Sequence, residues 1–374
     1  MTATLCTPMA LRGLTLRNRI VISPMCQYSA QGGIANDWHL AHYGRLAMGG
    51  AGLVLFEATS ISPEGRISPG DLGLWEDAQI APMARVAAFV KSQGAAAGVQ
   101  LAHAGRRAAS QRPWHGAGPL GPEDADLRGE PAWPVVAPSA LAMAEGWPVP
   151  QALSLEGIAQ VRADFAAAAR RALAAGFDVI EIHAAHGYLL HEFLSPLSNT
   201  RDDAYGGDRA RRMRLALEVA ADLRAIWPAD RPVFVRVSVV DGADGGQTVE
   251  DTVAFARELK ALGVDVVDCS TGGMLGSATA SRVPRGPGFQ LPYARAVREG
   301  AGIPAMAVGL ILDPHQAEAA LTEGDADLIA IGRTALDDPN WPLHAERALT
   351  GDRWDHWPPQ AGWWLERRAA SLRR

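Results

Sequence analysis

Short apolar runs recur along the chain, and most are followed by a stretch in which apolar residues return every three or four positions. The first pattern is typical of a buried strand, and the second is typical of a helix with one buried face. The predicted strands are residues 19–25, 53–58, 97–103, 177–182, 233–238, 264–269, 303–308 and 327–331. The predicted helices are residues 38–48, 80–92, 158–175, 211–226, 249–262, 293–298 and 313–324.

Eight strands that alternate with helices predict an α/β fold, namely a closed parallel (β/α)8 TIM barrel. An open dinucleotide-binding sheet is disfavoured, because no G-x-G-x-x-G follows an early strand. Residues 106–153 interrupt the alternation after the third strand and are rich in Pro, Gly and Trp, which predicts an inserted capping segment. The tail at residues 351–374 carries several tryptophans, which should pack on something. We expect residues 1–374 to form one domain.

Composition and charge narrow the class of function. The 374 residues carry a formal net charge of −6 without a long run of Lys and Arg, which argues against nucleic acid as a partner. The widely spaced Cys6, Cys26 and Cys269 predict free thiols, with neither a disulfide framework nor an iron–sulfur site. No signal peptide is visible, and no apolar run reaches membrane-spanning length. We therefore expect a cytoplasmic enzyme of small molecules with no membrane anchor.

The last two predicted strands end in glycine, at Val308-Gly309 and at Gly332-Arg333. In barrels of this kind the last two strand-to-helix loops commonly bind a phosphate group. Glycine lets the backbone approach an anion closely, and Arg333 can add a charge-assisted hydrogen bond. These residues indicate a phosphate site, with tight turns beside a surface arginine as the alternative.

Three polar side chains, His183, His186 and Tyr188, follow the fourth predicted strand. Barrel strands present catalytic groups at their carboxyl ends. Neutral imidazoles can donate hydrogen bonds to a carbonyl oxygen on which charge develops, and a phenol can deliver a proton. A metal site would need a third ligand, and the spacing does not match H-E-x-x-H, so we predict no metal. Two buried structural histidines are the alternative.

Arg236 interrupts the fifth apolar strand, where burial of a cation costs free energy unless it meets a negative partner. It indicates a bound anion or an electron-rich ring, or else an ion pair with Glu57, Glu181 or Asp268. Gln100 on the third strand offers a donor and an acceptor that suit the edge of a heterocycle, although a lone buried glutamine is often structural.

Several motifs distributed along the chain can be compared, as a set, with those of known families. They are Asn18-Arg-Ile-Val-Ile-Ser-Pro-Met-Cys-Gln-Tyr28, Asp37-Trp-His39, Glu57-Ala-Thr59, Gln100-Leu-Ala-His-Ala-Gly-Arg106, His183-Ala-Ala-His-Gly-Tyr-Leu-Leu190, Tyr205-Gly-Gly207 and Ile331-Gly-Arg333. In this combination the chain resembles the old yellow enzyme family of FMN-dependent ene-reductases, and more narrowly its xenobiotic reductase and YqjM-like branch. The resemblance extends from about Leu11 to about Trp341.

The resemblance implies that the barrel domain holds FMN without a covalent bond and uses NADPH or NADH as the reductant. The residues implied to bind FMN are Ser23, Pro24, Met25, Cys26, Ala58, Gln100, Arg236, Val308, Gly309, Gly332 and Arg333. Cys26 is also implied to touch the substrate, and Tyr28 to line its pocket. On the residues alone, Cys26 is as well explained by inert packing.

The implied reaction is reduction of the C=C bond of an α,β-unsaturated carbonyl compound. His183 and His186 would hold the carbonyl oxygen, the flavin would pass hydride to the β-carbon, and Tyr188 would give a proton to the α-carbon. The alternatives are another FMN barrel reductase or demethylase, and a flavin-free phosphosugar isomerase or aldolase barrel.

The tail motif Gly362-Trp-Trp-Leu-Glu-Arg367 resembles the end of the xenobiotic reductases, where a tryptophan from one subunit enters its neighbour's pocket. This resemblance implies a homodimer, or a homotetramer built from dimers. Trp364 is the candidate for the substrate-binding tryptophan, with Trp363 or Arg367 as alternatives. Packing of the tail within its own subunit is equally open.

Overall fold

The computed structural model describes residues 3–275, 283–351 and 353–372. Its centre is a closed barrel of parallel strands, in which each strand pairs with the next barrel strand and the last pairs with the first. The strands of the barrel are β3 (Ile20–Ile22), β4 (Leu53–Ser60), β5 (Ala96–Ala102), β8 (Val179–Ala184), β9 (Val233–Ser238), β10 (Val266–Ser270), β11 (Ala305–Ala307) and β12 (Leu328–Ile331). All eight predicted strands are present, so the predicted (β/α)8 barrel is confirmed.

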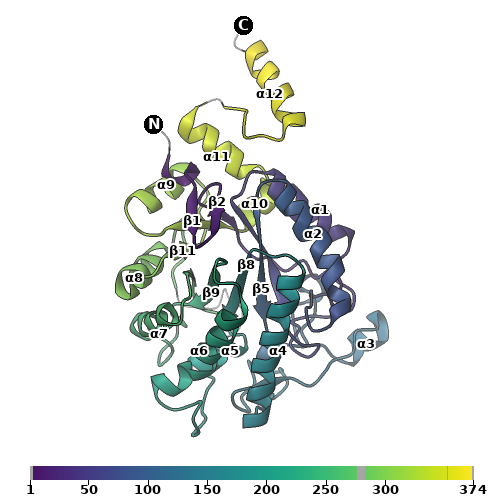
Figure 1. Ribbon diagram of the computed structural model, residues 1–374. Helices are drawn as coiled ribbons and strands as arrows, with labels where there is room; N and C mark the ends of the chain where they lie inside the picture. Colours follow the sequence, from purple (N-terminus) through teal and green to yellow (C-terminus); the bar gives the residue numbers. More distant parts are fainter. Residues whose placement is uncertain (1–2, 276–282, 352, 373–374) are drawn as a thin grey trace.

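Helices surround the barrel (Figure 1). The helices that correspond to the predicted ones are α1 (Asp37–Met48), α2 (Ile80–Ser92), α4 (Leu155–Ala174), α6 (Arg209–Ile226), α7 (Val249–Ala261), α8 (Leu291–Ala301) and α9 (Pro314–Thr322). Further helices are α3 (Pro122–Arg128), α5 (Leu189–Leu194), α10 (Arg333–Asp337), α11 (Trp341–Thr350) and α12 (Pro359–Leu372). Within the described ranges, no helix is both long and apolar enough to cross a membrane.

The barrel interior has an apolar layer and a polar layer. Side chains of a strand alternate between its two faces, so Val179, Glu181 and His183 of β8 share one face. Val179 belongs to a buried apolar cluster that also contains Phe234 of β9. Glu181 and His183 lie farther toward the carboxyl end of the same strand. The sequence of β8 therefore places an apolar side chain toward the amino end of the barrel and polar side chains toward its carboxyl end.

An antiparallel hairpin of β1 (Met9–Leu11) and β2 (Leu14–Leu16) packs on the apolar layer. Leu11 and Leu16 are buried in one cluster with Val21 and Leu53 of the first two barrel strands. The hairpin thus covers the amino end of the barrel and leaves the carboxyl end for the site. The sequence analysis did not predict it.

The segment between β5 and α4 contains α3 and a small parallel pair of β6 (Val136–Ala137) and β7 (Gln151–Ala152). In the described part of the chain the single-turn helices are Thr4–Cys6, Asp77–Gln79, Gly105–Arg107 and Pro113–His115, and the last two lie at the start of this segment. Met143 and Trp147 of the segment line a cavity together with His186 and Tyr188. The predicted insertion therefore caps a space at the carboxyl end of the barrel.

The tail divides into a packed part and an exposed part. Trp354 and Trp357 lie with ring centroids 5.7 Å apart, and Trp357 lies 5.5 Å from the ring of His344 in α11. Trp363 and Trp364 of α12 are 49% and 66% exposed. Figure 1 shows α12 projecting beyond α11 at the top of the view. Residues 352 and 373–374 of the predicted tail lie outside the described residues.

Glu192 of α5 gives the fold a dependence on pH. Its side chain is fully buried, and its Oε1 accepts the backbone N–H of Arg106 at 2.9 Å. Burial raises the pKa of Glu192 from 4.5 to about 8, against the opposing charge of Arg106. Between these two values the folded protein binds a proton that the unfolded chain releases, so the free energy of unfolding falls as pH rises.

Glu192→Gln should therefore flatten the stability profile, because glutamine keeps an oxygen acceptor and cannot ionise. In the wild type, Glu192 should make the unfolding free energy fall by up to ~1.4 kcal/mol per pH unit between about pH 5 and about pH 8. In the variant this contribution to the fall should be absent. Urea unfolding of both proteins across this range measures the slope. Parallel profiles for the two proteins would contradict the assignment.

Candidate functional site

The structure brings His183, His186 and Tyr188 together. His183 is the second-last residue of β8, and its ring centroid lies 5.1 Å from that of His186 and 4.8 Å from that of Tyr188. The turn that follows β8 has positive φ at His186 (61°) and at Gly187 (74°), after which Tyr188 precedes α5. His186 Nε2 lies 2.7 Å from Ser270 Oγ on β10, and His186 Nδ1 lies 3.3 Å from His183 Nε2. A strand end and a sharp turn thus place two imidazoles and a phenol in one cluster.

These three groups carry no charge at neutral pH. Burial, followed by the nearby Arg236 guanidinium, holds the pKa of both His183 and His186 well below its usual range. Burial, followed by the Cys26 thiol, raises the pKa of Tyr188 above its usual range. The cluster therefore consists of neutral hydrogen-bond donors, which can approach a substrate oxygen without the desolvation cost of an ion.

Strand register creates a second polar layer beneath this cluster. It sets Gln100 beside Glu181 on β5 and β8, and Arg236 beside Asp268 on β9 and β10. Gln100 Nε2 donates to Glu181 Oε1 at 2.8 Å, and Arg236 Nε forms an ion pair with Asp268 Oδ2 at 3.1 Å. Arg236 Nη1 also donates to Ser23 Oγ at 3.1 Å. Of the three ion-pair partners considered for Arg236, the structure selects Asp268.

This layer holds two carboxyl groups and one guanidinium. Burial, followed by the charge of Asp268, raises the pKa of Glu181 to about 8. Burial also raises the pKa of Asp268, against the opposing Arg236. Glu181 therefore keeps its proton at neutral pH, and the layer is close to electrically neutral. Glu181 Oε2 is buried and has no hydrogen-bond partner within the described residues, so a polar group of a ligand would satisfy it.

A cavity of about 640 Å³ runs along the carboxyl edge of the last strands. It is lined by His186 and Arg236 at one side and by the predicted phosphate residues Val308, Gly309, Gly332 and Arg333 at the other. The structure therefore brings these predicted residues to one cavity. The volume suits a cofactor larger than a phosphosugar.

The two glycines of this cavity differ in why they lack a side chain. Gly309 has a φ of 126°, which an L-residue rarely adopts. Gly332 has a φ of −110°, and the nearest atom to a Cβ added there would be Met25 Sδ at 3.5 Å. Packing within the chain therefore does not require glycine at Gly332. A ligand that approaches its backbone does explain it, and Arg333 beside it is exposed and available to an anion.

Gly332→Val should therefore lower the affinity for FMN while leaving the fold intact. Overpacking of a filled site typically costs ~1–3 kcal/mol, which corresponds to a dissociation constant about 5- to 150-fold higher. Fluorescence titration of the apoprotein with FMN measures the affinity, and the thermal midpoint of the apoprotein controls for folding. Unchanged FMN affinity would place the phosphate elsewhere.

A second cavity of about 550 Å³ adjoins the first through His186, which lines both. Tyr188 and Tyr28 line it from the barrel, and Arg107, Met143 and Trp147 line it from the capping segment. The barrel edge therefore offers two adjacent spaces, one long and one beneath the cap, with neutral donors at their border.

Other predicted residues lie around the end of β3. Ser23, Pro24, Met25 and Cys26 form an extended segment after the strand, and the Ser23 N–H donates to Ile331 O at 3.0 Å. Burial, followed by the charge of Asp71, raises the pKa of the Cys26 thiol well above its usual range. This thiol therefore stays protonated.

Ala58 is the remaining residue predicted to bind FMN, and it follows a register shift in β4. The shift falls between Phe56 and Ala58 where β4 pairs with β5, and Ala58 is buried in a cluster with the partly buried Cys26 and Tyr188. Ala58 therefore lies close to the side chains of the candidate site. A bulge of this kind commonly re-aims the backbone near an active site.

The sequence analysis missed residues that hold the turn at His186. Ser270, 84 positions away in the sequence, forms a hydrogen bond with the ring of His186. Arg107 Nη1 donates to His186 O and to Gly273 O at 3.0 Å each. Neither Ser270 nor Arg107 belongs to a local sequence motif that would indicate a contact with His186. Their contacts become visible only once the barrel brings the strand ends together. Within the described residues, no group of three or more His, Cys, Asp or Glu side chains could hold a metal ion.

A cofactor-sized cavity beside a capped cavity with neutral proton donors is what a flavin-dependent barrel oxidoreductase requires. Comparison with known proteins makes the assignment specific. The sequence pattern of the NADH:flavin oxidoreductase / NADH oxidase family matches residues 4–352. The chain therefore belongs to this family, which is the old yellow enzyme family.

Relatives of known structure or name agree with this membership. An NADPH dehydrogenase of Listeria monocytogenes serovar 1/2a is 46% identical over 341 residues, covering 91% of this chain and 93% of the relative. The structure of morphinone reductase superposes with a TM-score of 0.76 at 28% identity, over 93% of this chain and 90% of that chain. The structure of the old yellow enzyme homologue from Zymomonas mobilis superposes with a TM-score of 0.75 at 28% identity, over 95% of this chain and 96% of that chain.

The chain is thus an FMN oxidoreductase of old yellow enzyme type with a nicotinamide nucleotide as reductant. The predicted FMN and its predicted reductant are confirmed at this level. The flavin-free isomerase or aldolase alternative is excluded by the family.

Proposed function

We propose that the protein uses NADPH or NADH to reduce the C=C bond of α,β-unsaturated carbonyl compounds. The observation that carries this proposal is the cluster of His183, His186 and Tyr188, three neutral donors, of which His186 lines both cavities and Tyr188 lines the smaller one. Polarisation of a carbonyl oxygen makes the β-carbon of an enone electrophilic, and this chemistry needs donors at that oxygen.

We assign FMN to the larger cavity. Its phosphate would lie against Val308, Gly309, Gly332 and Arg333, where the open space at Gly332 fits a close backbone contact. Its ring would meet the residues at the other side of the site, namely Ser23, Pro24, Met25, Cys26, Ala58, Gln100 and Arg236. When bound, FMN accepts a hydride from the nicotinamide and supplies it to the substrate.

The residues of the chain would bind the substrate oxygen, donate the proton and contact the substrate. His183 and His186 would each donate a hydrogen bond to the carbonyl oxygen, because burial keeps both rings neutral. Tyr188 would give its phenolic proton to the α-carbon, since its raised pKa keeps that proton bound across the neutral range. Cys26 and Tyr28 would contact the substrate, and the capping segment would exclude water from the smaller cavity.

Trp364 cannot serve this pocket from its own chain, because it lines neither cavity and lies on the projecting α12 (Figure 1). We propose that it enters the pocket of a neighbouring subunit in a homodimer or homotetramer, with Trp363 and Arg367 as the alternatives. Arg367 lies 3.3 Å from the centroid of the Trp363 ring, so these residues would act together.

Trp364→Ala should change the ratio of the kcat/KM values for a small and a bulky enone by roughly 10-fold, because the side chain would form part of a hydrophobic pocket. Oligomeric state should be measured beside the kinetics, so that loss of assembly is separated from loss of a pocket wall. Unaltered selectivity in an intact oligomer would favour simple packing of the tail.

An anaerobic screen tests the proposed function as a whole. Beyond the first equivalent per flavin, the holoenzyme should consume NADPH or NADH only when an activated alkene is present, and 2-cyclohexenone should yield cyclohexanone in an amount equal to the nucleotide consumed. A yellow protein that shows no alkene-dependent turnover with any enone would instead indicate another FMN barrel activity, such as a demethylase.

A further inference from the structure

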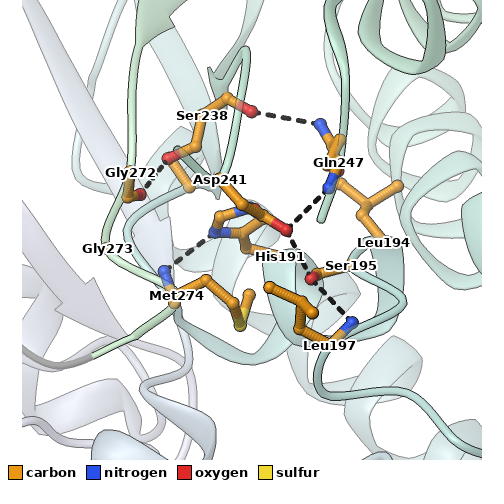
Figure 2. Close-up of polar contacts among 12 residues, drawn as sticks. His191, Leu194, Ser195, Leu197, Ser238, Asp241, Gln247, Gly272, Gly273 and Met274 are labelled. Carbon is orange, nitrogen blue, oxygen red and sulfur yellow. Dashed lines mark hydrogen bonds and ion pairs between the residues drawn. The ribbon is translucent and has the colours of Figure 1, made fainter. Parts of the chain in front are cut away.

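Figure 2 shows a polar network around His191, Ser195 and Asp241, which contacts the turn between His186 and Tyr188 through a hydrogen bond from Gly187 to His191. His191 Nε2 lies 2.8 Å from Asp241 Oδ1, and Ser195 Oγ donates to Asp241 Oδ2 at 2.6 Å. The Gln247 N–H donates to the same Oδ2 at 2.8 Å. His191 and Ser195 are fully buried and Asp241 is 2% exposed, and these residues line neither cavity.

The residue types suggest a hydrolytic triad, but the geometry excludes one. A nucleophilic serine must hydrogen-bond to the histidine that removes its proton. Here Ser195 donates to Asp241 and leaves both ring nitrogens of His191 to other partners. The network also has no space for a substrate. Its role must therefore be exerted through the residues that it holds.

The hydrogen bonds of His191 fix its tautomer. The Gly187 N–H donates to His191 Nδ1 at 2.9 Å, so Nδ1 carries no proton and the ring is neutral. The proton is on Nε2 and is donated to Asp241. Burial raises the pKa of Asp241, the hydrogen bonds from His191 and Ser195 lower it, and the net shift is downward. An ionised Asp241 thus keeps the lone pair of Nδ1 directed at Gly187.

Gly187 is the residue between His186 and Tyr188, and its backbone has little freedom. A Cβ at this position would lie 2.2 Å from Gly273 O. The neighbouring His186 N–H donates to Ser238 Oγ at 3.0 Å, and His186 O accepts from Arg107 Nη1 at 3.0 Å. His186 O and the Gly187 N–H belong to the same peptide unit, so Arg107 and His191 hold the peptide between His186 and Gly187 from its two sides. The next N–H of the turn, that of Tyr188, donates to Ala185 O at 3.2 Å. His191 therefore supplies the side-chain acceptor for the peptide that joins His186 to the residue before Tyr188.

We propose that His191, oriented by Asp241, is a positioning residue that sets the place of Tyr188 relative to His186. This inference rests on the roles proposed above for those two side chains. Loss of the acceptor would leave the Gly187 N–H buried and unsatisfied, which favours relaxation of the turn. A displacement of about 1 Å at a reacting group can slow the chemistry by ~10²-fold.

Two substitutions of His191 separate the acceptor from the donor. The Oδ1 of asparagine can occupy the place of Nδ1, so His191→Asn keeps the acceptor for Gly187 and loses the donor to Asp241. Glutamine reaches to the place of Nε2, so His191→Gln keeps the donor and loses the acceptor. Ser195→Ala is the matched control, because it removes a hydrogen bond from Asp241 without touching the turn.

The FMN-loaded variants should be compared by stopped flow in both half-reactions. In His191→Gln we expect reoxidation by 2-cyclohexenone to slow by ~10²-fold, and reduction by NADPH to change by less than about threefold. His191→Asn and Ser195→Ala should stay within about tenfold of the wild type in both steps. An equal loss in His191→Asn and His191→Gln, or equal slowing of both half-reactions, would overturn the proposal.

Amide hydrogen exchange provides a readout that needs no enone. Exchange at Gly187 should accelerate in His191→Gln and remain slow in His191→Asn and Ser195→Ala. If His191→Gln does not fold, a folded His191→Asn that loses ~10²-fold in reoxidation would by itself overturn the proposal. A wild type that no enone reoxidises would refute the proposed function, while the exchange rates would still decide the role of His191.

Discussion

Replacement of Tyr188 by phenylalanine should slow reoxidation of the reduced enzyme by 2-cyclohexenone by about 10²- to 10⁴-fold, the range expected for loss of a general acid. The ring of Tyr188 packs edge-on against His183 at 4.8 Å, and phenylalanine keeps this contact. Only the phenolic proton is lost. Reduction of the enzyme by NADPH transfers a hydride and no proton from Tyr188, so this step should remain within about tenfold of the wild type.

Stopped-flow absorbance of the two half-reactions measures this difference directly. Tyr28→Phe is a matched control, because Tyr28 lines the same cavity and its phenol has no proposed proton-transfer role. Since burial raises the pKa of Tyr188 above its usual range, the wild-type rate should show no loss from ionisation of this phenol up to its ordinary pKa of 10. Equal slowing of both half-reactions in Tyr188→Phe would remove the proton-donor role.

Joint replacement of His183 and His186 by alanine should nearly abolish binding of phenols, which mimic the enolate oxygen. Loss of one oxyanion donor commonly costs ~10²- to 10³-fold in rate, so enone reoxidation should fall at least that far. FMN affinity should change much less, because only His186 lines the larger cavity. The thermal midpoint of the double variant controls for the loss of two buried rings.

The charge state of these histidines gives a second check. Burial and Arg236 hold the pKa of both rings well below 6.5, so phenol affinity should not change where an ordinary histidine titrates. Spectral titration of the holoenzyme with a phenol across pH measures it. Unchanged phenol affinity in the double variant would contradict the assignment, as would a transition in the wild type near pH 6.5.

Local patterns were sufficient to predict the barrel, because its strands are apolar runs and most of its helices have one buried face. The failures have equally local causes. Helix α5 is buried on every side, so Leu189–Leu194 shows no amphipathic period from which to recognise it. The hairpin β1–β2 has three residues in each strand, which is too short for alternation to stand out.

The candidate site was predictable where side chains project from strand ends. His183, Gly309 and Gly332 follow apolar runs, and a parallel barrel collects such positions at one edge. The choice of Asp268 as the partner of Arg236 was not predictable, because it depends on the register of β9 against β10. The role proposed for His191 was not predictable either, because its partner Asp241 follows a different strand.

A single-turnover experiment tests the central claim most directly. The FMN-loaded protein should be bleached under anaerobic conditions by one equivalent of NADPH and then mixed with 2-cyclohexenone. We predict that the flavin absorbance returns fully and that one equivalent of cyclohexanone forms. A protein that remains bleached with the enone and regains its colour only when air is admitted would contradict the account.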